Sequence, residues 1–113
     1  MKKIIYFSIS VFLLCSCTTP QLYSWGKYQT TSYNYLKNND EKSTKELVKT
    51  YQNIIDKQTG TRRVVPPGVY ADYGFLLLQI NKSTEGKKML AKEIELYPES
   101  KVFIDRILKK LEK

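Results

Sequence analysis

The chain has 113 residues, a formal net charge of +8 and no histidine, and 42% of its residues are apolar. This length and composition fit one folded domain with a modest core, and they exclude a disordered chain. The absence of histidine excludes histidine-based acid–base catalysis and histidine-ligated metal sites. Both cysteines, Cys15 and Cys17, lie near the N-terminus, so no thiol nucleophile or zinc cluster is expected further along. We therefore expect no catalytic residues, no cofactor and no metal.

The N-terminus has the form of an export signal. Two lysines precede an apolar run, residues 4–14, which is too short for a membrane-spanning helix of about 20 residues. The run ends in Leu-Cys-Ser-Cys, which resembles the lipobox of bacterial lipoproteins. Cleavage is then expected between Ser16 and Cys17, with acyl chains on Cys17. Cys15 is the poorer candidate because a leucine precedes it, and an ordinary secretory signal is the alternative.

The lipobox resemblance also implies a location and a division of the chain. Two or more acyl chains anchor a protein stably, and Thr18 after the acylated cysteine implies the periplasmic face of the outer membrane. Such a location makes nucleic acid a poor partner. We expect a signal peptide over residues 1–16, a lipidated tether over 17–26 and a helical domain over 27–113. The aromatic residues near the tether either rest at the lipid headgroups or pack on the body: Tyr23, Trp25 and Tyr28.

The rest of the chain has helical periodicity, which predicts an all-α fold of about five helices. A weak stripe of Tyr28, Ser32, Tyr35 and Leu36 favours a first helix over 28–37. Ser43 or Thr44 can cap a second helix, whose apolar residues recur at helical spacing: Leu47, Val48, Tyr51, Ile54 and Ile55. The linker over 62–68 contains two prolines.

Three further helices follow the linker. Residues 69–80 are apolar almost all round, which predicts a helix sandwiched between others, with a buried strand as the alternative. Ser83 or Thr84 can cap the next helix, which ends at Pro98. The last helix, 99–112, is expected to turn its apolar stripe inward: Phe103, Ile104, Ile107, Leu108 and Leu111.

The spacing of small residues in the second half resembles one tetratricopeptide repeat. Counted from Pro67, Gly74 is eighth and Gly86 twentieth, the positions at which such repeats bring two helices close together. A glycine within a helix costs about 1 kcal/mol relative to alanine, and close helix contact is a reason to accept that cost. Glu93 departs from the repeat pattern, which usually has alanine there. The resemblance implies that Gly74 and Gly86 face each other across antiparallel helices.

Several short motifs extend the resemblance over nearly the whole chain after Cys17. They are Tyr23-x-Trp25-Gly26-x-Tyr28, Val65-Pro66-Pro67-Gly68-x-Tyr70-Ala71, Tyr97-Pro98-Glu99-Ser100 and Phe103-x-Asp105-Arg106. They are similar to a family of small bacterial lipoproteins, domain-of-unknown-function family 4810. Its members tend to be encoded beside a lipoprotein resembling the CsgG curli-secretion channel. The resemblance supplies this context and no activity.

Three hypotheses for the function follow. The leading one is a lipid-anchored envelope adaptor that binds another envelope lipoprotein, CsgG-like, or itself. The repeat resemblance implies four candidate contacts, Ala71, Phe75, Leu78 and Gln79, and Trp25 is a further candidate because interface energy concentrates in a few aromatic or aliphatic anchors. The alternative is that the basic surface binds an anionic envelope polymer or lipid, with Arg62 and Arg63 as candidates because guanidinium groups suit phosphate and carboxylate. An enzyme using Asp72 with Asp105 or Glu93 is the least favoured, because nothing in the spacing singles out a pair.

Overall fold

The computed structural model describes Lys3 and residues 19–112. The predicted signal cleavage site and Cys17 lie outside the described residues. Within the described part the chain forms α-helices and no strand, which confirms the all-α prediction. The helices are α2 (Tyr28–Asn38), α3 (Glu41–Asp56), α4 (Val69–Gln79), α5 (Ser83–Leu96) and α6 (Lys101–Leu111), with a 3-10 turn, Pro98–Ser100, before α6.

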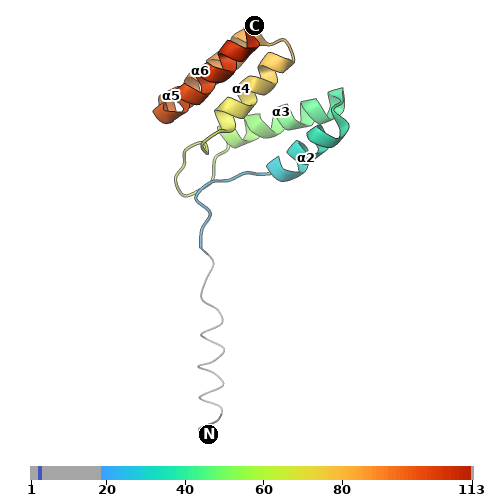
Figure 1. Ribbon diagram of the computed structural model, residues 1–113. Helices are drawn as coiled ribbons and strands as arrows, with labels where there is room; N and C mark the ends of the chain where they lie inside the picture. The colour runs from blue at the N-terminus through green and yellow to red at the C-terminus, as the bar shows by residue number, and fades with distance from the viewer. Residues whose placement is uncertain (1–2, 4–18, 113) are drawn as a thin grey trace.

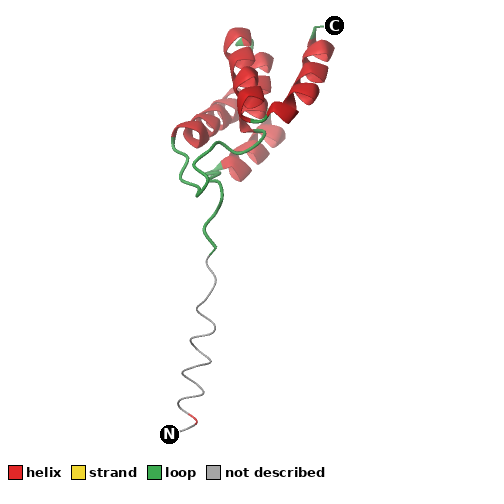
Figure 2. Cartoon of the chain, turned by 90° about the vertical axis from the view of Figure 1, so that its left-hand side faces the viewer, coloured by secondary structure: helices red, strands yellow, loops and turns green. Residues whose placement is uncertain are grey.

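The helices pack mainly with their neighbours in the chain. Helix α2 packs on α3, and α4 packs closely on α5, each pair joined by a short turn (Figure 1). Helix α6 follows α5, and the C-terminus lies at the end of the body opposite the segment that leads into α2, as both views show (Figures 1 and 2). Among the described residues, no helix combines the length and apolar character that a membrane crossing requires.

The start of α3 differs from the sequence-based expectation. Asp40, rather than Ser43 or Thr44, is the N-cap: its carboxylate accepts from the Ser43 backbone N–H at 2.8 Å. The Ser43 hydroxyl in turn accepts from the Asp40 backbone N–H, which completes a capping box. Helix α5 also differs, because Ser83 is its first residue and no side chain caps it. Both helices therefore begin slightly earlier than predicted.

Helix α4 is buried on two sides, as its apolar composition predicted. One side joins a core built with α3, in which Leu47, Ile54 and Leu77 are nearly inaccessible to solvent. The other side joins a second core with α5 and α6, centred on Leu90 and Ile104. Each core removes apolar side chains from water, which contributes the main favourable term in folding. The helix over residues 69–79 thus holds the two halves of the body together.

Gly74 and Gly86 face each other where α4 and α5 meet, as predicted. A Cβ atom added to Gly74 would lie 2.9 Å from the Gly86 carbonyl oxygen. A Cβ atom added to Gly86 would lie 2.8 Å from the Gly74 carbonyl oxygen. Real Cβ atoms are excluded from such distances, so the absence of side chains at both positions lets the two backbones touch.

The last helix is less buried than the sequence suggested. Of the predicted inward stripe, Ile104 is fully buried, and Ile107 and Leu108 are half-buried. Phe103 and Leu111 are 59% exposed, and Val102 is exposed as well. The prediction that Phe103 and Leu111 face inward is wrong, because no later element of the described chain packs over that side of α6.

Candidate functional site

A shallow groove of about 240 Å³ runs between α2 and α4. Its floor is formed by buried side chains of α3 and α4, and its rims carry partly exposed rings and polar groups. We call it the α2–α4 groove. It is lined by Tyr28, Ser32, Tyr35, Leu36, Leu47, Tyr51, Asp72, Phe75, Leu76 and Gln79. All four residues of the weak stripe predicted for the first helix lie here, so that stripe borders a groove.

A row of tyrosine rings leads from the groove into the core. The Tyr28 ring lies 5.8 Å from the Tyr51 ring, and the Tyr51 ring lies 5.5 Å from that of Tyr73, measured between centroids. Burial raises the pKa of Tyr28 and of Tyr51, with the Asp72 charge adding to the effect. Both phenols therefore stay neutral at physiological pH. Across the groove the Tyr35 hydroxyl donates to the Gln79 Oε1 atom at 3.2 Å.

Asp72 supplies the negative charge of the groove. The residue as a whole is exposed, yet its carboxyl group is packed beside the Tyr28 hydroxyl. Burial of the carboxyl group raises the pKa of Asp72, the charge of Glu93 raises it further, and the interaction with Tyr28 opposes both effects. A cationic or amide group of a bound segment would find both an acceptor and flat apolar rings in the groove.

The structure separates the groove residues predicted from the sequence into two pairs. Phe75 and Gln79 line the groove. Ala71 is buried with Leu90 in the second core, and Leu78 is half-buried, with its side chain beside Gly86. Ala71 is therefore not available to a partner, and Leu78 belongs to the contact between α4 and α5.

The apolar character of the groove continues onto α6. The Phe103 ring meets the Phe75 ring edge to face, with 6.5 Å between centroids. Phe103 is mostly exposed, and Leu36 on the opposite rim is exposed too. Large exposed apolar side chains that lie together are unusual on a monomeric protein and are typical of contact surfaces. Sequence periodicity identified Phe103 as core and so missed its place in this surface.

We call the segment before α2, residues 19–26, the leader, and it is fixed to the body from Gln21 onward. The Gln58 side chain accepts from the Ser24 backbone N–H at 2.6 Å and donates to the Ser24 carbonyl at 3.1 Å. Gly60 lies directly against Leu22 and Tyr23, where a Cβ atom would collide with their backbone. The predicted tether over 17–26 is thus held by the body in its C-terminal half.

The remaining predicted residues cluster around the leader. The Arg62 guanidinium donates to the Tyr23 hydroxyl at 3.0 Å and lies over the Tyr23 ring. Arg63 is exposed in the adjacent turn. The Trp25 ring lies 5.4 Å from the Tyr28 ring, yet Trp25 remains 40% exposed. The two arginines and Trp25 therefore share one end of the molecule, although the sequence suggested them for different roles.

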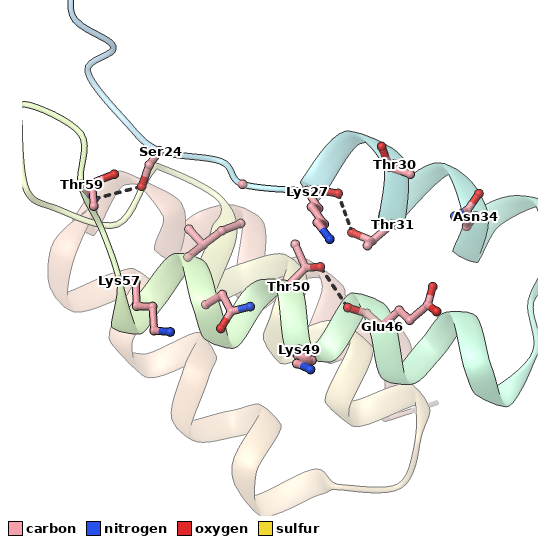
Figure 3. A pocket seen from close by; sticks show the side chains of 13 residues that line it. Ser24, Lys27, Thr30, Thr31, Asn34, Glu46, Lys49, Thr50, Lys57 and Thr59 are labelled. Carbon is pink, nitrogen blue, oxygen red and sulfur yellow. Dashed lines mark hydrogen bonds between the residues drawn. The ribbon is translucent and has the colours of Figure 1, made fainter.

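A second, polar cleft of about 780 Å³ lies between α2 and α3 (Figure 3). The small polar residues Thr31 and Thr50 lie at its base. The Thr31 hydroxyl donates to the carbonyl of Lys27, the residue before α2, and the Thr50 hydroxyl donates to the Glu46 carbonyl of α3. Three lysines and one glutamate are among the lining residues, which makes the cleft basic. Sequence reading missed it, although its polar residues recur at helical spacing. The cleft is lined by Ser24, Gly26, Lys27, Thr30, Thr31, Asn34, Glu46, Lys49, Thr50, Asn53, Ile54, Lys57 and Thr59.

Glu93, the departure from the repeat pattern, has a defined place. Its side chain is 1% exposed, and its Oε1 atom accepts from the Gly68 backbone N–H at 2.7 Å. Gly68 is the residue before α4, so the carboxylate binds at the N-terminal end of that helix, where negative charge is favourable. The other candidate acid, Asp105, pairs with Lys101 on α6. The three carboxylates considered for catalysis thus lie in three different settings.

The comparisons with known proteins place the chain in a family. The model of one family, described as a domain of unknown function, DUF4810, matches residues 22–107. No curated protein and no solved structure matches the chain. The match runs from the leader into α6 and so includes the α2–α4 groove and the polar cleft. Because it covers most of the chain, the protein belongs to the DUF4810 family of domains of unknown function.

Proposed function

We propose that this chain is a lipid-anchored adaptor of the cell envelope, which binds another envelope lipoprotein through its helical body. The observation that carries the proposal is the α2–α4 groove together with its apolar extension over Phe103. The lipobox-like sequence ending at Cys17 supports an anchor on the membrane. The family resemblance described above implies a CsgG-like lipoprotein as the partner.

The distribution of polar and apolar surface over the body supports an open C-terminal end. Arrays of tetratricopeptide-like units are soluble when their terminal units have polar outer faces. At the other end of the body, the face between α2 and α3 is polar because the polar cleft lies there, while Tyr33 and Leu36 of α2 are exposed. The α6 end instead exposes Val102, Phe103 and Leu111. A partner that covers this end would complete the array and remove the exposed rings from water.

Two exposed positions at the groove rims give the sharpest test. Leu36→Ser combined with Phe103→Ser removes apolar surface without entering either core. Interface energy concentrates in a few aromatic or aliphatic anchors, so we expect the double variant to weaken partner binding by about tenfold or more. Tyr33→Ser is the control, because Tyr33 is 62% exposed on α2 and belongs neither to the groove lining nor to the exposed α6 end.

Binding is measured between the purified chain and the purified CsgG-like lipoprotein, with circular dichroism to verify the fold of each variant. A photo-crosslinker placed at Gln79 should join the partner, and one placed at Lys87 on α5 should not. Light scattering of the chain alone detects self-association. If the double variant binds as tightly as the parent while remaining folded, the groove is not the binding surface.

The polar cleft favours a second candidate function, in which the body binds an anionic envelope polymer. Lys27, Lys49 and Lys57 surround the hydroxyl and amide groups of the cleft. Exposed charge interactions are screened over about 10 Å at 0.1 M salt. Binding of a soluble anionic glycan should therefore weaken steeply as salt is added, whereas binding through the apolar groove should change little.

A further inference from the structure

The body grips the leader immediately after the predicted lipid attachment site. The Thr61 backbone N–H donates to the Gln21 carbonyl at 3.0 Å, and the Arg62 N–H donates to the Leu22 carbonyl at 3.2 Å. The hydrogen bonds between Ser24 and Gln58 hold the same segment a few residues further along. The chain is therefore fixed to the body from Gln21 onward, and only residues 18–20 separate this point from Cys17.

Such a short connection leaves the body little freedom. One residue spans at most about 3.5 Å, so Gln21 lies within roughly 14 Å of the Cys17 backbone. The headgroup region of a bilayer is about 5–7 Å thick on each side. With acyl chains of Cys17 in the bilayer, the leader end of the body is held at or just above the headgroups.

The side chains at this end suit such a position. Leu22 is 58% exposed and Trp25 is 40% exposed, although both lie in a segment held by several hydrogen bonds. Tryptophan is enriched where membranes meet water, because its ring is apolar and its N–H is polar. Arg63 is exposed nearby. Arg62 donates one hydrogen bond to the Tyr23 hydroxyl, which leaves other guanidinium N–H groups for a ligand. Guanidinium groups match phosphate geometry.

We propose that the leader surface, defined as Leu22, Trp25, Arg62 and Arg63, docks on the phosphate headgroups of an anionic bilayer. The inference rests on the proposed lipid anchor at Cys17 and goes beyond it. The anchor keeps the protein on the membrane, and the leader surface fixes which way the body faces. The indole of Trp25 lies at headgroup depth, and the two arginines contact lipid phosphates.

Trp25 is the only tryptophan of the chain, so its fluorescence reports this surface alone. The purified acylated protein is incorporated into vesicles of phosphatidylethanolamine with phosphatidylglycerol, or of phosphatidylcholine alone. Bromine-labelled lipids quench tryptophan according to depth. We expect strong quenching by lipids brominated near the headgroup in the anionic vesicles, weaker quenching in phosphatidylcholine, and recovery of emission with added salt.

Charge variants test the arginines against a matched control. Arg62→Gln with Arg63→Gln should weaken docking by about twenty-fivefold, from a roughly fivefold contribution of each basic residue near an anionic surface. Lys109→Gln with Lys110→Gln removes the same charge from α6 and should leave quenching unchanged. If the arginine double variant loses helical circular dichroism, Arg63→Gln alone replaces it, with an expected loss of about fivefold. Leu22→Ser, at another exposed position, should also weaken docking.

A flexible glycine–serine spacer between Thr18 and Thr19 separates docking from simple tethering. If the leader surface binds the membrane, Trp25 stays quenched despite the longer tether. If quenching disappears, or if charge variants and control behave alike, the docking proposal is overturned. Flotation of the vesicles reports the anchor independently. Protein that fails to float contradicts the lipid anchor, whereas protein that floats with Trp25 unquenched contradicts the docking surface alone.

Discussion

Replacing Gly86 with alanine should destabilise the protein, although alanine is the better helix former. The added Cβ would lie 2.8 Å from the Gly74 carbonyl oxygen and 3.0 Å from the Leu78 Cγ atom. The leucine side chain can move, but the carbonyl belongs to the α4 backbone, so the helices must separate. Overpacking of this kind typically lowers the free energy of unfolding by about 1–3 kcal/mol. The better helix propensity of alanine offsets about 1 kcal/mol of that loss.

Because the collision involves backbone, we expect a net loss of about 1–2 kcal/mol in the free energy of unfolding. In a domain of this size, 1 kcal/mol changes the melting temperature by about 4–8 °C. Thermal unfolding followed by circular dichroism should therefore show a decrease of roughly 5–15 °C. Lys87→Ala, at the next and exposed position of α5, is the control and should stay within about 0.5 kcal/mol of the parent.

The partner position gives a second check on the same reasoning. Gly74→Ala should also destabilise, since its Cβ would lie 2.9 Å from the Gly86 carbonyl oxygen and from Leu90. The double variant should lose less stability than the two single variants added together, because helices already separated by one Cβ accommodate the second. A Gly86→Ala protein that melts at or above the parent temperature would refute the close contact of α4 with α5.

Three further predictions concern single side chains. Glu93→Ala leaves the Gly68 N–H without its acceptor and should lower the free energy of unfolding, measured in urea, by about 1–3 kcal/mol. Glu93→Gln keeps an acceptor and should lower it less, so an equal loss in both variants would contradict this role. The pKa of Asp72 is raised in the folded state, so its contribution to stability is full at low pH and is lost as pH rises through the folded pKa. Asp72→Asn should therefore have a higher melting temperature than the parent at pH 7, and the difference between the two melting temperatures should decrease in acid. Cys17→Ala should abolish incorporation of labelled fatty acid and release the protein from membranes or leave its precursor uncleaved; retained label would contradict the assignment and point to Cys15.

The sequence was sufficient to predict the helices because most of them carry a local signal. The apolar run of α4 and the small residues at Gly74 and Gly86 predicted a central helix and its closest contact, and both are confirmed. The cap at Asp40 was missed, although an aspartate three residues before a serine is a capping pattern visible in the sequence.

The groove was harder to predict, because periodicity shows which residues share a face but not what covers it. Phe103 and Ile104 are adjacent in the sequence, yet one is mostly exposed and the other is fully buried. The contact of Gln58 with Ser24 joins residues 34 positions apart and has no repeating pattern to reveal it. The sequence shows Glu93 as a departure from the repeat pattern. Its role as acceptor for the Gly68 N–H could not be predicted, because the two residues are 25 positions apart and meet only in the folded chain.

The leader and the C-terminus lie at opposite ends of the body, and this separation bears on both proposals (Figures 1 and 2). A body docked by Leu22 and Trp25 would hold the C-terminal end of α6 away from the bilayer. Binding to the membrane and binding to the partner would then use different side chains and should not compete. The arginine double variant should therefore bind the partner as tightly as the parent in detergent solution. A shared loss of both activities would place the partner at the leader end, beside Trp25.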